Sequence, residues 1–162
     1  MQFVIEQRFP CPPDRFFDLL EGEELEDRVK ASSSSVREAL GAHWDGPIFV
    51  RRTRIRPRRE LPGLVAKLLG PEGLSYVQVV HTARQDQENR WHLEVDRVGE
   101  RVRIGGLETA RADGSGMRLR LDTTVEVDVP LVAGRVEAAV RREIERVFER
   151  RRIIVEAMVA GI

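Results

Sequence analysis

The residue types that could carry chemistry are few in this chain and lie far apart. The three histidines, His43, His81 and His92, lie on three different segments, and no two of them have the spacing of metal ligands. A metal site needs convergent His, Cys, Asp or Glu side chains. Cys11 lies between two prolines at a predicted helix start, which could lower its pKa, but no histidine stands near it as a base. We expect no metal site, no cofactor and no catalytic residue, with Cys11 an inert thiol.

Two glycine motifs are explained better by structure than by catalysis. Gly114–Gly116 is the tip of a predicted hairpin, and no helix follows it as a nucleophile elbow requires. Ile104–Glu108, "IGGLE", places two glycines in the middle of a predicted strand. This pattern indicates a bulge or close backbone packing rather than a phosphate cradle.

The sharpest local charge feature is Arg51–Arg59, "RRTRIRPRR", with six arginines in nine residues. A nucleic-acid surface would need such charge, but no aromatic residues interleave it for base stacking. The acidic run Glu21–Asp27 could lie alongside it, and the whole chain has 27 basic and 27 acidic residues. We interpret the run as a solvated strand edge, where arginines discourage edge-to-edge pairing, and expect no nucleic-acid partner.

Length and composition indicate an ordinary globular protein. The 162 residues predict a single domain over 1–162, with 41% hydrophobic and 33% charged residues. One cysteine excludes an intrachain disulfide and fits a reducing compartment. No secretory pattern opens the sequence, and no apolar run approaches the roughly 18 residues that span a membrane. We expect a cytoplasmic protein without integral membrane association, whose oligomeric state the sequence leaves open.

Hydrophobic periodicity predicts the elements of the first half. Gln2–Phe9 alternates as a strand, and two short helices follow at Asp14–Leu20 and Glu23–Ala31. Ser32–Trp44 fits a helix or, as we prefer, a strand with Val36, Leu40, Ala42 and Trp44 on one face. That strand forms a hairpin with Ile48–Arg56. Leu61–Leu69 has helical spacing and is either a lid or a core-packing helix.

Four further strand candidates, each closed by a turn signal, are Leu74–Arg84, Arg90–Val98, Arg101–Ala112 and Gly116–Val129. The last has one apolar and one polar face, as in an antiparallel sheet with one buried side. The register of Leu74–Arg84 is ambiguous. Either His81 faces the core with Val77 and Val79, or Tyr76, Val80 and Thr82 do.

The chain ends in a long amphipathic helix of about 28 residues, roughly 40 Å. Its apolar stripe contains Val132, Val136, Val140, Ile144, Val147, Ile154 and Met158, widened by Phe148 and Val155. Only long strands supply an apolar surface of that length. The sequence therefore predicts an α+β, helix-grip architecture: a curved antiparallel sheet of six to seven strands wrapped around the C-terminal helix.

Such a sheet cannot touch a straight helix everywhere, and an apolar gap with a few polar groups is the usual form of a small-molecule site. Arg151 lies inside the stripe, where it snorkels, pairs with a strand carboxylate, or anchors the polar group of a ligand. The candidate ligand-binding residues are Tyr76, His81, Trp91, Leu93, Val95, Leu119, Leu121, Thr123, Val125, Val136, Val140, Ile144, Phe148 and Arg151.

The element order, with "FPCPPDRFFDLL" after the first strand and "VDVPLVAGRVE" before the last helix, resembles the START-like or SRPBCC superfamily. That superfamily includes the birch pollen allergen and polyketide cyclases and aromatases, and this chain looks most like an uncharacterised bacterial branch. The resemblance covers essentially the whole chain and implies a hydrophobic cavity for lipids, polyketides or other apolar molecules.

Three functions remain open at this point. The first is non-enzymatic binding or transport of a hydrophobic small molecule or lipid. The second is a cyclase- or aromatase-like enzyme in which Tyr76 or His81 directs proton transfer. The third is a protein-interaction module with a filled core and the basic strand as its contact surface.

Overall fold

The computed structural model describes residues 1–58, 63, 66–67 and 72–162. The elements in chain order are β1 (Gln2–Phe9), α1 (Pro13–Glu21), α2 (Glu24–Ser32), β2 (Val36–Asp45), β3 (Ile48–Arg56), β4 (Tyr76–Ala83), β5 (Glu88–Val95), β6 (Val102–Asp113), β7 (Gly116–Val127) and α4 (Ala133–Val159). Two short 3₁₀ turns, Arg84–Asp86 and Gly99–Arg101, flank β5. The helix expected at Leu61–Leu69 lies for the most part outside the described residues.

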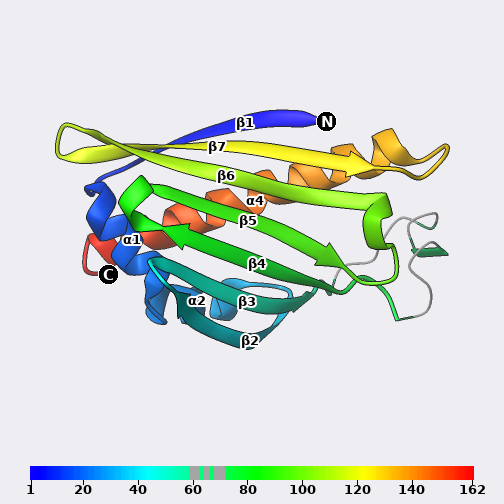
Figure 1. Cartoon of the computed structure of the whole chain (residues 1–162), viewed down its shortest axis with the longest axis horizontal. Helices are drawn as coiled ribbons and strands as arrows, with labels where there is room; N and C mark the ends of the chain where they lie inside the picture. The colour runs from blue at the N-terminus through cyan, green and yellow to red at the C-terminus, as the bar shows by residue number, and fades with distance from the viewer. Residues whose placement is uncertain (59–62, 64–65, 68–71) are drawn as a thin grey trace.

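The strands form one seven-stranded antiparallel sheet in the order β1-β7-β6-β5-β4-β3-β2. Figure 1 shows α4 running behind this sheet, with α1 and α2 packed at one end of it. Apolar and polar residues alternate along the sequence of β7, and the strand accordingly buries every second residue. The predicted helix-grip architecture is confirmed.

Direct cross-strand pairing defines which side chains share a face, because paired residues point to the same side. One complete row across the sheet is Phe3, Thr123, Gly106, Trp91, Val80, Arg51 and Ala42. The Trp91 ring lies 5.9 Å from the Phe148 ring of α4, measured between centroids. This row therefore belongs to the inner face, which α4 covers.

Two apolar clusters fill the space under the helices. The first joins α1 and α2 to the C-terminal part of α4 and contains the fully buried Phe16 and Phe17. The second joins Trp91, Leu121 and Val125 to the middle of α4 through Ile144 and Phe148. Both clusters lie on the inner face, so the core is the interior of the grip.

Two details of the predicted faces are wrong. A register shift between Ala39 and Gly41 in β2 puts Val36 on the outer face, opposite to Ala42 and Trp44. On α4, Val147 is 36% exposed, and the stripe that contacts the sheet runs through Ile144, Phe148 and Val155.

The arginine-rich strand is also not the edge strand that the sequence predicted, since β3 lies between β2 and β4. Its arginines alternate between faces. Arg52 and Arg54 point outward and pair with Glu94 and Asp96 on β5 and its following turn. Arg51 points inward and is buried at 9% exposure.

Candidate functional site

The helix covers the inner face of the sheet unevenly. α4 packs chiefly on β7 and β1, and there the inner residues Leu121 and Val125 are 2% and 0% exposed. Five inner residues of the two central strands stay partly exposed, while Thr82, Asn89 and Trp91 on the same face are buried. The five are Tyr76, Gln78 and Val80 on β4, and Leu93 and Val95 on β5. Central strands normally bury their inner face, so these residues mark the less covered half of the grip.

Two polar atoms face this interior without a partner. The indole N–H of Trp91 and the hydroxyl of Thr123 are buried and have no hydrogen bond within the described part of the chain. They lie in one cross-strand row, on either side of Gly106. A Cβ at Gly106 would come within 2.9 Å of Trp91 Nε1, so the glycine lets the indole lie against the strand. The close packing expected for "IGGLE" is confirmed.

A series of hydrogen-bonded polar side chains crosses the interior beside these atoms. Arg151 of α4 binds Glu108 of β6 through two hydrogen bonds, Nη1 to Oε1 at 3.0 Å and Nη2 to Oε2 at 2.7 Å. Asn89 donates to Glu108 Oε1 at 3.2 Å and accepts from Thr82 at 2.8 Å. Glu108 is 1% exposed, so this pair is shielded from water and from salt.

Arg151 therefore pairs with a strand carboxylate, one of the alternatives left open by the sequence, and its charge is neutralised within the chain. Its guanidinium also lies over the Phe148 ring, at 4.6 Å from the centroid. Its Nε is buried without a hydrogen-bond partner among the described residues. Trp91 Nε1, Thr123 Oγ1 and Arg151 Nε are thus three buried polar atoms without a hydrogen-bond partner among the described residues.

Tyr76 faces the same interior from β4, next to α4. Burial raises the pKa of its hydroxyl to about 12, while the charge of Arg37 lowers the pKa and that of Glu143 raises it. The phenol therefore stays protonated at neutral pH and is a hydrogen-bond donor.

Most of the predicted ligand-binding residues lie on the two inner surfaces. From the sheet these are Tyr76, Trp91, Leu93, Val95, Leu121, Thr123 and Val125, and from α4 they are Val136, Val140, Ile144 and Phe148. Leu119 also faces inward but belongs to the cluster under α1, on the other side of the Glu108–Arg151 pair.

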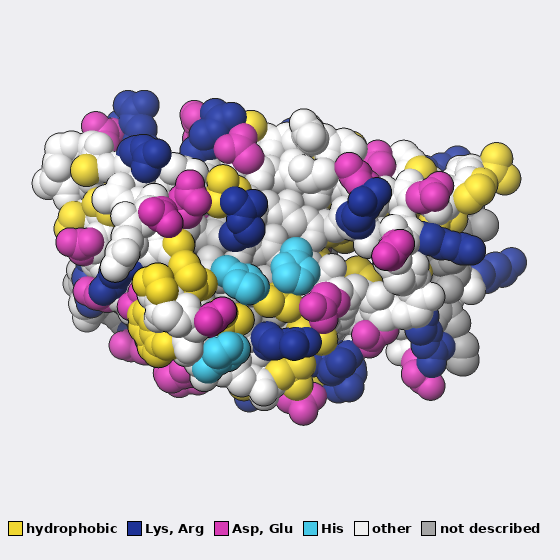
Figure 2. Space-filling model, viewed as in Figure 1, with side chains coloured by type: hydrophobic (Ala, Val, Ile, Leu, Met, Phe, Trp, Pro, Cys, Tyr) yellow, Lys and Arg dark blue, Asp and Glu magenta, His cyan; other side chains and the backbone are white. Residues whose placement is uncertain are grey.

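His81 does not line the interior. It pairs with Val50 and Arg90 on the outer face, where its ring stacks on His92 at 6.3 Å between centroids. Figure 2 shows the histidines gathered on this face. His81 and His92 border an open groove of about 450 Å³. Sequence periodicity left this register open because both faces of β4 carry valines.

Sequence reasoning missed Glu108, Asn89 and Arg37 as inner-face residues. Glu108 had a signal, since it shares its strand face with Ile104 and Ala110 in an otherwise apolar alternation. Arg37 had none, because the irregularity in β2 decides which side chains of that strand face inward.

The other chemical candidates do not form a site. Cys11 is 2% exposed, and its burial raises the pKa of the thiol more than nearby Arg15 lowers it, as expected for an inert cysteine. No group of three or more potential metal ligands occurs among the described residues. Among those residues, too, no helix combines the length and apolarity needed to cross a membrane.

A family model described as "Protein of unknown function (DUF2505)" matches residues 5–158. The chain belongs to this family. No curated protein matches the DUF2505 chain. At 11–15% sequence identity, similarity to a solved structure shows the fold alone.

Several solved structures share that fold at low sequence identity. The di-domain ARO/CYC BexL from the BE-7585A biosynthetic pathway is 13% identical with a TM-score of 0.65, covering 98% of this chain and 47% of that one. Ms6760 from Mycobacterium smegmatis is 11% identical with a TM-score of 0.63, covering 99% and 91%. Ara h 8.0201 is 15% identical with a TM-score of 0.60, covering 96% and 97%. The START-like resemblance is confirmed at the level of the fold.

Proposed function

We propose that this protein binds a hydrophobic small molecule or lipid between the inner face of the sheet and α4, without catalysing a reaction on it. The observation that carries the proposal is the partial exposure of five inner residues of β4 and β5, from Tyr76 to Val80 and at Leu93 and Val95. An apolar, concave, largely preformed space is the usual form of a small-molecule site.

The polar groups in this space support the same function. Trp91 Nε1 and Thr123 Oγ1 are buried without partners among the described residues, and an unpaired buried polar group costs free energy. An apolar ligand with one or two oxygen atoms would satisfy both groups while its hydrocarbon part covers Val80 and Leu93. Such sparse polar contacts orient a ligand in an otherwise apolar pocket.

The test is binding of a neutral apolar fluorophore, N-phenylnaphthylamine, to the full chain. We expect its fluorescence to rise with the wild-type protein and with Val4→Trp, because Val4 is 45% exposed on the outer face of β1. Val80→Trp places the same large side chain in the interior and should abolish the signal. Equal fluorescence for the two tryptophan variants would place the probe elsewhere and refute the proposed site.

A cyclase- or aromatase-like enzyme is the second candidate, favoured by the protonated phenol of Tyr76 in the interior. His81 is excluded from that role because it faces outward. Conversion of a poly-ketone by the wild type, with loss of turnover but not of binding in Tyr76→Phe, would favour the enzyme. The third candidate, a filled interaction module, predicts no probe binding at all.

A further inference from the structure

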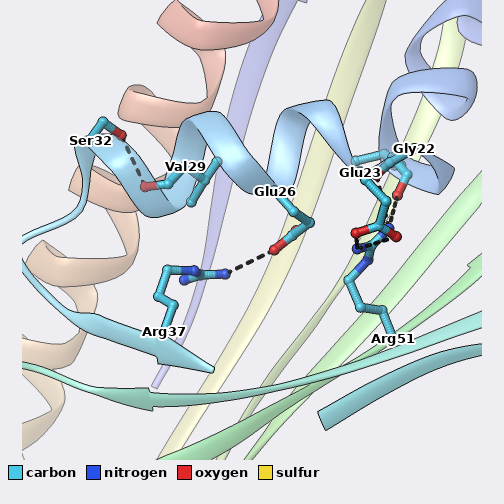
Figure 3. A network of polar contacts seen from close by, with 8 residues as sticks. Gly22, Glu23, Glu26, Val29, Ser32, Arg37 and Arg51 are labelled. Atoms are coloured by element: carbon cyan, nitrogen blue, oxygen red, sulfur yellow. Dashed lines mark hydrogen bonds and ion pairs between the residues drawn. The ribbon is translucent and has the colours of Figure 1, made fainter. Parts of the chain in front are cut away.

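Arg37 and Arg51 from the sheet and Arg151 from α4 point into the space between the sheet and α4. They differ in how their charge is balanced. Arg151 has the two-pronged contact with Glu108. Arg51 binds Glu23 at 3.3 Å, and its Nη2 donates to the carbonyl oxygen of Gly22 at 2.9 Å. Figure 3 shows Arg51 held in this way against the junction of α1 and α2. The charge of each of these two arginines is therefore balanced by a carboxylate of the chain.

The positive charge of Arg37 is balanced much less well. Within the described residues its guanidinium makes one hydrogen bond, from Nη2 to Oε2 of Glu26 at 3.5 Å, the contact drawn in Figure 3. The Arg37 side chain is 11% exposed, and its Nε is buried without a partner. A buried cation with one long contact is costly, so this site favours a further anion.

Tyr76 is placed to bind the same anion. Arg37 and Tyr76 both pair with Ile55, one from each side, so the two residues lie in one row of the inner face. The Tyr76 hydroxyl has no hydrogen-bond partner among the described residues, and the Arg37 charge acts on it electrostatically. Glu143 of α4 also acts on Tyr76, but its own carboxylate is bound by Arg146 at 2.7 Å.

We propose that Arg37 and Tyr76 bind the carboxylate of an acidic, otherwise apolar ligand, an inference that rests on the proposed function. The Nε–H of Arg37 with an adjacent Nη–H forms the fork that grips a carboxylate with two parallel bonds. The apolar part of the ligand extends along β4 and β5 past Val80 to Trp91. From Tyr76 to Val80 this path is about 13 Å, at about 3.3 Å per strand residue.

The experiment compares decanoate with decanol, which have the same tail and differ in the head group, by calorimetric titration of the full chain near neutral pH. We expect decanoate to bind at least about tenfold more tightly, the gain of one charge-assisted hydrogen-bonded contact. Arg37→Gln should remove this preference by weakening the binding of decanoate much more than the binding of decanol. Arg52→Gln, an outer-face arginine paired with exposed Glu94, should keep the preference.

Equal binding of decanoate and decanol by the wild type would overturn this inference and leave the proposed function standing. Binding of neither would overturn both. Because the wild-type comparison needs no variant, the inference is testable even if Arg37→Gln fails to fold. Tyr76→Phe adds a second test: it should weaken the binding of decanoate more than that of decanol, and an equal loss for both ligands would contradict a role at the head group.

Discussion

The decisive side chains of this interior are polar ones in an apolar setting. Glu108 lies between apolar strand neighbours, and its buried carboxylate accepts hydrogen bonds from Arg151 and Asn89. Thr82 extends this hydrogen-bonded series by donating to Asn89. A buried ion pair adds little net stability, but removing one member leaves the other charge without compensation. The pair therefore fixes how α4 sits on β6 more than it stabilises the fold.

Replacing Glu108 with Gln should destabilise the protein by about 3–5 kcal/mol, because the buried Arg151 charge is left without its carboxylate. Urea unfolding measures this. Glu149→Gln, which breaks an exposed pair with Arg152, should change stability by less than about 0.5 kcal/mol. The double variant Glu108→Leu with Arg151→Met should recover much of the lost stability. If it loses as much stability as Glu108→Leu and Arg151→Met together, the two side chains are not energetically coupled.

Tyr76 is the single tyrosine of the chain, so its ionisation can be followed directly by the ultraviolet absorbance of tyrosinate. In the folded protein it should titrate near pH 12, against about 10 when unfolded. Because the unfolded state loses this proton first, stability should fall as the pH rises from 10 towards 12 and be unaffected by this group below 10. Titration near 10 in the folded protein would place the hydroxyl in water.

Among the elements, the junction of α1 and α2 is held to the sheet by Arg51. Arg51 reaches from β3 to the segment where α1 ends and α2 begins, and binds backbone carbonyl oxygens there as well as Glu23. Helix ends leave such carbonyls unsatisfied, so this arginine serves the C-terminus of α1. The acidic start of α2 thus lies alongside the arginine strand, as the sequence suggested.

Arg51→Met should therefore cost about 1–3 kcal/mol, because buried acceptors lose their donor. The loss should be local: amide hydrogen exchange should accelerate in α1 and α2 and remain unchanged in β7. Arg52→Met, on the opposite face of the same strand, should be nearly neutral. A uniform increase in exchange over the whole chain would show that Arg51 supports the global fold instead.

Periodicity was sufficient to predict nearly every described element, because each strand and helix carries its own apolar pattern. It failed where a non-local fact decides the outcome. A single irregularity at Ala39 reverses the face of Val36, and the strand order turns the presumed edge β3 into an interior strand. His81 could not be assigned because apolar residues lie on both faces of β4. Which strand carboxylate Arg151 binds could not be predicted, because Glu108 lies 43 residues away in the sequence.

At the scale of the whole molecule, one long helix faces a seven-stranded sheet and packs chiefly on two of its strands. α4 packs on β7 and β1, α1 and α2 close one end, and the centre of the concave face stays partly open. Polar groups from β2 to β7 border that opening. Under the proposed function, this architecture is a container whose selectivity lies in a few side chains.

The most direct test of the container is native mass spectrometry of the protein purified from its own source. The account predicts one apolar molecule per chain above the 18.5 kDa of the polypeptide, released on denaturing extraction. Val4→Trp should carry the same molecule and Val80→Trp should not. A bare 18.5 kDa mass for the wild type, unchanged after exposure to apolar ligands, would contradict the account.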